Sequence, residues 1–268
     1  MVKTNNIKLM KTTRFLSVAM LFTALSLGFA SCDNDKGNEP EDPTQGGQTE
    51  QSGGEETPAP DPYNGHAYVD LGLSVKWATC NVGATKPEEY GNYYAWGEVQ
   101  PKEVYEWSTY KFMDSNVNDW NGVTKYTIAD YQTDGVWYDS EGNFIGDNKT
   151  VLDPEDDAAA VNMGGNWRMP TREEQKELKT KCTWTWTTLN GVNGYNVEGP
   201  NGNAIFFPAA GSRYNIGLNY AGSYGYYWSS SLYTGDSDYA YYLYFGSDFV
   251  GWSYYDRYCG RSVRGVCE

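Results

Sequence analysis

The chain has 268 residues, and its 35 acidic against 20 basic side chains give a formal net charge of −15 and a pI of about 4.5. A surface this acidic repels phosphate backbones, which argues against nucleic acid as a partner. The chain has one histidine, His66, and no Cys-x-x-Cys pair or His-rich cluster. The sequence therefore favours a protein without a His-based nucleophile, a metal site or a cofactor.

The first 31 residues are typical of an export signal. Four basic residues precede an apolar run over 15–30, which is shorter than the roughly 20 residues of a membrane span. The run ends in small residues directly before Cys32, an arrangement that resembles the bacterial lipobox, in which the cysteine is acylated. We therefore expect lipidation at Cys32 and a protein that the lipid alone anchors at the outer membrane or cell surface. An ordinary secretory peptide is the alternative.

Residues 32–62 are predicted to be a flexible tether. They are built from Glu, Asp, Pro, Gly, Gln, Thr and Ser, and such a segment buries too little to repay the entropy of ordering. Its opening, Asp33–Lys36, resembles the acidic export signal of surface lipoproteins in the Bacteroidetes, although a plain acidic linker fits equally well. Without the four basic residues of the signal and the net −8 of the tether, residues 63–268 keep a charge of −11. These 206 residues suit one domain with a real core.

The first half of that domain is expected to be short strands, long loops and two helices. Strands are predicted over 68–73 and 75–78, and loops over 98–148 with a turn at 139–143. Asp153, followed by Pro154, predicts the N-cap of a helix that continues to Val161. Thr171 and Glu174 form a capping box for a second helix that ends near Lys181.

Two features of this half leave alternatives open. The acids at 153 and 155–157 suit either helix capping, which we favour, or calcium. An oxidising envelope would allow disulfides, but the sequence does not choose among the three pairings. The cysteines concerned are Cys80, Cys182, Cys259 and Cys267.

From Cys182 onward the chain is predicted to be β structure, with turns at Gly191 and Gly194 and a buried strand over 204–207 that ends at Pro208. Over 240–245, alternation places Tyr241, Leu243 and Phe245 on a core face. The same alternation turns Tyr242 and Tyr244 toward solvent.

A series of motifs in this order resembles the Fibrobacter succinogenes major paralogous domain, a family common in Bacteroidetes lipoproteins. The resemblance implies an α+β fold of the C-type-lectin type, with mostly antiparallel strands, two helices and long irregular loops. Calcium-dependent sugar lectins of this fold carry Glu-Pro-Asn or Gln-Pro-Asp, which this chain lacks. The motifs are Tyr68–Leu73 with Lys76–Ala78, Asn81–Ala84, Tyr94–Glu98, Asn166–Thr171, Tyr227–Ser231 and Ser262–Arg264.

The run 213–259 is the candidate binding region. It combines Tyr with Ser, Gly and Asp, the composition of an evolved paratope, in which stiff amphipathic rings are flanked by small polar side chains. Tyrosines that merely pack across strands are the alternative. The predicted ligand-binding residues are Ile216, Tyr220, Tyr233, Asp236, Asp238, Tyr239, Tyr242, Tyr244, Asp248, Phe249, Ser253, Tyr254, Tyr255, Asp256 and Tyr258.

The same run resembles the variable region of diversity-generating retroelement proteins, in which adenine mutagenesis rewrites exposed positions. The resemblance implies that the residues at such positions, Cys259 among them, are diversified on a fixed frame. That frame would consist of Trp228, Leu243, Phe245, Val250, Trp252 and Arg257.

These observations predict a surface-displayed lipoprotein that is not an enzyme and binds an extracellular protein or glycan. The alternatives are a structural envelope protein that assembles through these strands, and a carbohydrate-active enzyme with an acid pair.

Overall fold

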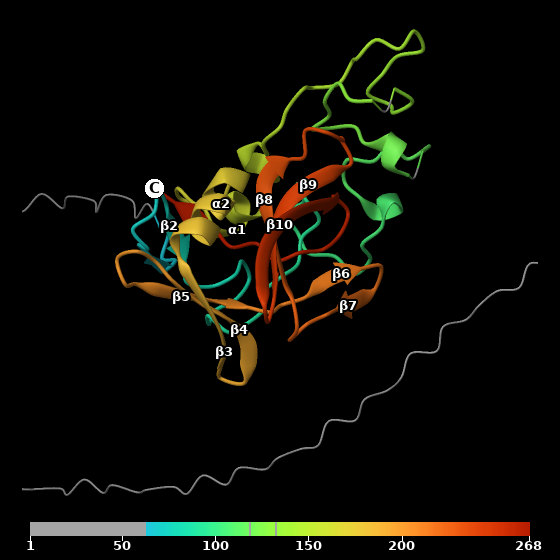
Figure 1. Ribbon diagram of the computed structural model, residues 1–268. Helices are drawn as coiled ribbons and strands as arrows, with labels where there is room; N and C mark the ends of the chain where they lie inside the picture. Colours follow the sequence, from blue (N-terminus) through green and yellow to red (C-terminus); the bar gives the residue numbers. More distant parts are fainter. Residues whose placement is uncertain (1–62, 118, 132) are drawn as a thin grey trace, which may run out of the picture. The chain divides into compact units, whose positions relative to one another are not determined.

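A computed structural model describes residues 63–117, 119–131 and 133–268 (Figure 1). The signal peptide, the tether and Cys32 lie outside these residues. The described chain is α+β and mostly antiparallel, as predicted. Its helices are α1 (Ala158–Met163) and α2 (Arg172–Lys181). Its strands are β1 (Tyr68–Val69), β2 (Lys76–Ala78), β3 (Thr183–Leu189), β4 (Val192–Glu198), β5 (Ala204–Pro208), β6 (Ser212–Tyr214), β7 (Gly217–Asn219), β8 (Gly225–Leu232), β9 (Tyr239–Gly246), β10 (Phe249–Asp256) and β11 (Val266–Cys267).

The strands form small sheets, and their order brings the two ends of the domain together. β2 is central in the sheet β1-β2-β11, so the end of the chain pairs beside its first strands. The other sheets have the orders β10-β9-β8 and β3-β4-β5, and β6 and β7 form a hairpin. The described part of the segment 98–148, which was predicted to be loops, contains two short 3₁₀ turns and isolated bridges (Figure 1).

Helix α2 confirms the predicted capping box. Glu174 N–H donates to Thr171 Oγ1 at 3.2 Å, and Thr171 N–H donates to Glu174 Oε2 at 2.7 Å. Arg168 donates two hydrogen bonds, of 2.8 and 2.6 Å, to the same carboxylate. Behind the cap, buried Gln175 donates to the carbonyls of Tyr227 and Trp228, so α2 is fixed against β8.

The first helix differs from its prediction. Pro154–Asp156 form a 3₁₀ turn, and α1 begins after Asp157, whose carboxylate accepts from the N–H groups of Ala159 and Ala160. Asp153 caps nothing because its side chain is bound to lysines. The predicted turn at Gly194 is also wrong. This glycine lies within β4 opposite Pro208, where a Cβ would collide with the backbone of Phe207.

Two buried arginines join distant segments at the end of the chain. Arg264 donates to Asn81 Oδ1 and to three backbone carbonyls, at 2.8–3.0 Å. Arg257 donates to the Tyr110 hydroxyl and to three carbonyls, at 2.8–3.1 Å. Both guanidinium groups are at most 1% exposed and have every nitrogen paired. They therefore tie the loops of the first half to the last strands.

The four cysteines are free thiols, so none of the possible disulfides is formed among the described residues. Within those residues no helix has the length and apolar character that a membrane span requires.

Candidate ligand-binding site

Strand β9 alternates as predicted, but its second face is only partly open. Leu243 and Phe245 are buried on one face. Tyr244 is half-buried on the other. The prediction that Tyr242 faces solvent is wrong, since it is only 7% exposed. The guanidinium carbon of Arg261 covers its ring at 3.5 Å from the centroid.

The antiparallel register decides which face each tyrosine of β10 occupies. Tyr255 is opposite Ala240 and shares the face of Tyr242. Tyr254 is opposite Tyr241 and lies on the other face. The predicted tyrosines therefore belong to two surfaces rather than to one.

On the first surface, side chains of the β6–β7 hairpin and of strands β8, β9 and β10 enclose a hollow of about 450 Å³, which we call the tyrosine hollow. Tyr220 and Tyr255 are 63% and 47% exposed at this site, whereas Tyr242 is buried within it. The lining residues are Ser212, Tyr214, Asn219, Tyr220, Tyr226, Tyr242, Tyr255, Cys259 and Arg261.

The electrostatics of the hollow differ from those of the whole chain. Its lining contains one arginine and no acid, although the chain carries a net charge of −15. Burial raises the pKa of Tyr226 to about 12 and that of the Cys259 thiol to about 12. Both groups are neutral at pH 7, so Arg261 is the charge that a ligand in the hollow would meet.

The part of the chain that builds this hollow matches a known family model. Residues 184–266 match a domain of unknown function, DUF8237. All nine lining residues fall within that match. No curated protein and no solved structure matches the chain.

The second surface is a tyrosine stack on the opposite face of the same sheet. The rings of Tyr233 and Tyr254 are parallel within 7°, with centroids 3.7 Å apart. Tyr239 and Tyr241 surround them at 5.4–6.5 Å, and Arg172 lies over the Tyr241 ring at 4.4 Å. Tyr254 keeps 42% of its surface exposed.

The structure exposes only some of the fifteen predicted site residues. Tyr220, Tyr242 and Tyr255 line the hollow, and Ile216 lines a neighbouring pocket beside Arg213. Five of the fifteen residues are exposed, namely Ile216, Tyr220, Asp248, Tyr254 and Tyr255. Six are half-buried, namely Tyr233, Tyr239, Tyr244, Phe249, Ser253 and Asp256.

The remaining four, Asp236, Asp238, Tyr242 and Tyr258, are buried, which contradicts their prediction as surface residues. The Tyr258 ring packs against Trp107 at 4.8 Å, and Asp236 Oδ2 accepts from the Tyr131 hydroxyl at 2.9 Å. Cys259 was expected at an exposed, diversified position but is 4% exposed. Contacts with the loops of the first half cover several of these side chains, and a local pattern does not reveal such contacts.

Five lining residues were not predicted as ligand-binding from the sequence, namely Ser212, Tyr214, Asn219, Tyr226 and Arg261. A local signal existed for Tyr226, because alternation in β8 places it on the same face as Trp228. No local sequence pattern marks Arg261. It follows β10 in the chain, and only the tertiary structure places it in the lining of the hollow.

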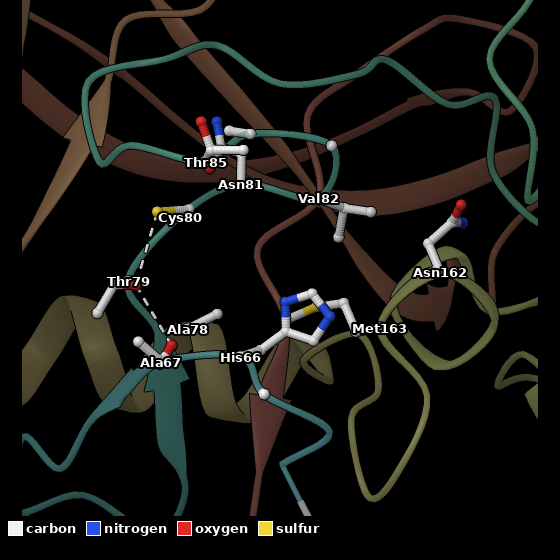
Figure 2. A pocket seen from close by; sticks show the side chains of 13 residues that line it. His66, Ala67, Ala78, Thr79, Cys80, Asn81, Val82, Thr85, Asn162 and Met163 are labelled. Carbon is white, nitrogen blue, oxygen red and sulfur yellow. Dashed lines mark hydrogen bonds between the residues drawn. The ribbon is translucent and has the colours of Figure 1, made fainter.

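A separate pocket, of about 350 Å³, is lined by both His66 and Cys80 (Figure 2). No hydrogen bond joins the imidazole to the thiol. The Cys80 sulfur lies 3.6 Å from Thr79 Oγ1, and the His66 ring meets the Trp167 ring edge-on, with centroids 6.2 Å apart. The arrangement does not supply the base contact that an activated thiol needs.

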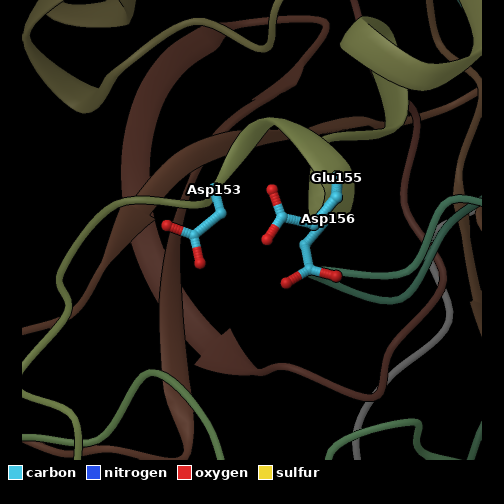
Figure 3. A group of neighbouring side chains, drawn as sticks. All are labelled: Asp153, Glu155 and Asp156. Atoms are coloured by element: carbon cyan, nitrogen blue, oxygen red, sulfur yellow. The ribbon is translucent and has the colours of Figure 1, made fainter.

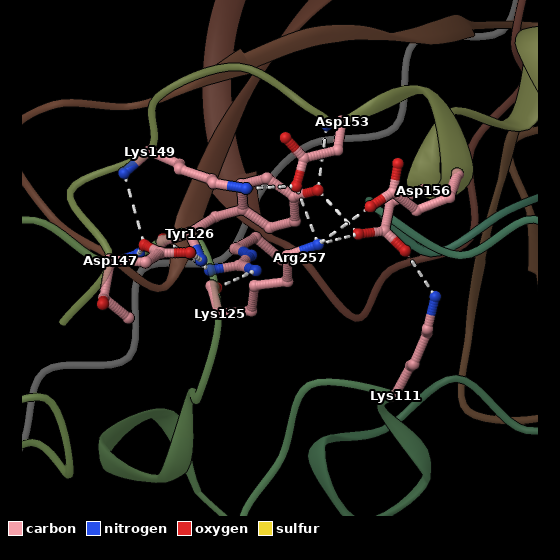
Figure 4. Close-up of polar contacts among 10 residues, drawn as sticks. Lys111, Lys125, Tyr126, Asp147, Lys149, Asp153, Asp156 and Arg257 are labelled. Carbon is pink, nitrogen blue, oxygen red and sulfur yellow. Dashed lines mark hydrogen bonds and ion pairs between the residues drawn. The ribbon is translucent and has the colours of Figure 1, made fainter.

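The acids in and beside the 3₁₀ turn that precedes α1 converge as a group. Oxygens of Asp153, Glu155 and Asp156 lie within 4.8 Å of one another (Figure 3). Lys125 Nζ lies 2.9 Å from Asp153 and 2.5 Å from Asp156, and Lys111 and Lys149 each bind one of these two carboxylates (Figure 4). The side chains of Asp153 and Asp156 therefore pair with lysines and do not cap a helix.

Replacing Asp156 with asparagine is expected to lower the free energy of unfolding by about 1–2 kcal/mol. The buried carboxylate accepts from two lysines and from the Tyr126 hydroxyl at 2.6 Å. The loss stays moderate because both lysines are partly exposed and can be rehydrated. Urea unfolding at pH 7 measures it, with Glu155→Gln as the exposed control. An unchanged midpoint would contradict the role given to this network.

Proposed function

We propose that this protein is a surface-displayed lipoprotein that binds an extracellular ligand through the tyrosine hollow. The observation that carries the proposal is the convergence of five tyrosines from four strands and one turn around one open depression. The surrounding frame is rigid because Trp228, Leu243 and Phe245 are fully buried beneath it.

The mechanism is burial of tyrosine rings around a few polar contacts. Tyrosine has two side-chain torsions, so fixing its ring costs little entropy, and its hydroxyl adds a hydrogen bond at the rim. Tyr220 and Tyr255 are the accessible rings of the hollow. Two or three such anchors carry most of the energy in a typical interface.

The contrast between exposed and buried positions also supports diversification of this surface. Tyr220 and Tyr255 can be exchanged with little loss of packing, whereas Tyr242 and Cys259 cannot. The flanking DNA is expected to hold a reverse transcriptase gene and an imperfect template repeat. Their absence would remove diversification from the proposal but would leave ligand binding unaffected.

The double substitution Tyr220→Ala with Tyr255→Ala is expected to reduce ligand capture at least about tenfold. Purified full-length protein in detergent is applied to arrays of extracellular glycans and proteins, and captured protein is quantified. Tyr254→Ala is the matched control because it removes an equally exposed ring from the opposite face. Melting temperatures should change by less than a few degrees. Equal loss in the control variant, or collapse of the fold in the double variant, would contradict the assignment of binding to the hollow.

One feature favours assembly as a second candidate function. β10 is the outer strand of the sheet β10-β9-β8, and among the described residues no strand pairs with its other edge. Such an edge can accept a strand of another chain. Sedimentation velocity over a range of concentrations tests this function, since assembly predicts a concentration-dependent oligomer.

A further inference from the structure

We propose that the tyrosine hollow binds the carboxylate of an acidic sugar residue, with Arg261 as the group that receives it. This inference rests on the proposed function and names the chemical class of its ligand. Four observations carry it: the unpaired state of Arg261, the absence of acid in the lining, the single positive charge and the character of the walls.

The Arg261 side chain is a buried cation in which two of the three guanidinium nitrogens are buried without a hydrogen-bond partner. It is 4% exposed, and its Nε and Nη1 atoms are both buried and unpaired. Its guanidinium lies among four aromatic rings, which contact its faces but accept little of its hydrogen-bonding capacity. A buried charged donor without a partner costs free energy. A ligand that supplies an acceptor to Arg261 would remove that cost and so bind more tightly.

The two neighbouring arginines show that this state is not general in the fold. Arg257 and Arg264 are as deeply buried, yet every nitrogen of each guanidinium has a partner at 2.8–3.1 Å. They act as structural braces. Arg261 differs because it also lines an open hollow, where an acceptor can arrive from outside.

No carboxylate of the chain fills that role. Arg261 forms no ion pair with the described acids. Burial raises the pKa of Asp256 to about 6, and the Arg261 charge opposes that rise. Asp256 is therefore close enough to feel the arginine, but it does not line the hollow.

The charge of the site favours a carboxylate over a phosphate. One arginine balances one negative charge, and the planar fork of a guanidinium matches the two oxygens of a carboxylate. A phosphate group carries close to two charges at pH 7, and no second cation lines the hollow to balance it.

The walls favour a sugar as the carrier of that carboxylate. Tyr214, Tyr220 and Tyr226 supply flat apolar ring surfaces on which the C–H face of a pyranose can pack. Ser212 and Asn219 add neutral hydrogen-bonding groups for sugar hydroxyls. The volume of about 450 Å³ is at the scale of a small ligand site.

Calorimetric titration of the full chain in detergent tests the ligand class. The probes are methyl β-D-glucuronoside, N-acetylneuraminate, methyl β-D-glucoside and N-acetylglycine. We expect both acidic sugars to bind at least about tenfold more tightly than the neutral glucoside, the difference made by one charge-assisted bidentate contact. N-acetylglycine, a carboxylate without a sugar ring, should bind more weakly than either acidic sugar. Equal affinity for glucoside and glucuronoside, or preference for N-acetylglycine, overturns the proposal.

Arg261→Met provides a readout that a merely structural arginine would not give. Because the buried guanidinium is unpaired, its replacement should leave the melting temperature unchanged or raise it, while glucuronoside binding is lost. A fall in melting temperature with unchanged glucuronoside binding overturns the proposal. If this variant fails to fold, Tyr220→Ala is the second variant. The Tyr220 ring is 63% exposed, so its removal should leave the fold intact. Tyr220→Ala is expected to weaken glucuronoside binding at least about fivefold, and Tyr254→Ala is the control on the opposite face.

The failures of the two proposals are distinguishable. If array ligands are captured and lost in the Tyr220 and Tyr255 double variant, but no acidic sugar binds, the hollow is a binding site of another chemistry. If acidic sugars bind and Arg261→Met abolishes that binding, the ligand class holds even where no protein on the array is captured.

Discussion

Replacing Arg264 with methionine is expected to lower the free energy of unfolding by about 3–5 kcal/mol, the usual cost of breaking a buried charged network. The guanidinium holds Asn81 and the carbonyls of Ala78, Thr79 and Phe206 at 2.8–3.0 Å. Methionine fills a similar volume but leaves these acceptors buried and unpaired. The substitution should also loosen the junction between β2 and β5, because Arg264 bridges them.

Urea unfolding followed by tryptophan fluorescence measures this loss. Arg172→Met is the matched control, since Arg172 is partly exposed and pairs with an exposed glutamate. The comparison with Arg261→Met is more informative still, because both arginines are buried and only one is paired. Equal destabilisation by the two substitutions would contradict the distinction between Arg264, which stabilises the fold, and Arg261, which is proposed to bind a ligand.

The second large effect is a loss of stability as the pH rises from 5 to 8.5, caused by Asp238. Burial, and then the adjacent Asp236 carboxylate, raise the pKa of Asp238 to about 8. A carboxyl whose pKa is higher in the folded state holds its proton there after the unfolded chain has lost it. Stability is therefore greatest below the unfolded pKa and falls as the pH rises toward 8. Since one pKa unit corresponds to about 1.4 kcal/mol and about three units separate pH 5 from the folded pKa, the loss is on the order of 4 kcal/mol.

Asp238→Asn is expected to remove most of this dependence, because an amide has no proton to lose. Melting temperatures from pH 5 to 8.5 record the effect, with Asp248→Asn at an exposed position as the control. The titratable groups around Asp238 are Asp236, Asp256 and Tyr239. Asp256 contributes in the same direction at lower pH, since its pKa is raised to about 6. A flat profile in the wild-type chain would refute the buried, protonated state of Asp238.

Local patterns predicted the elements whose determinants lie close together in the sequence. The capping box of α2 joins Thr171 to Glu174, three residues apart, and its helix was predicted within one residue. Asp153 was assigned as a helix cap because the residues at 153–156 also fit a helix start, and the sequence does not show that Lys149, four residues earlier, and Lys125, 28 residues earlier, both reach its carboxylate. The charge of a cap residue does not reveal which cation will reach it.

The same division explains the candidate site. Alternation along β9 correctly separated Leu243 from Tyr242. Whether the Tyr242 face is open depends on Arg261, which reaches it from a later segment. The strand register, which decides that Tyr254 and Tyr255 face opposite ways, is likewise set by pairing across β9 and β10. The alternation of the strand was predictable from the sequence, whereas the depth and the charge of the hollow were not.

The opposite orientation of Tyr254 and Tyr255 has a practical consequence for how such a surface evolves. Two adjacent codons address separate contact areas, one beside the hollow and one beside the Tyr233 stack. A change confined to one codon can therefore alter one contact area while the other is conserved. A single short stretch of gene can in this way alter two separate surface areas of one scaffold independently.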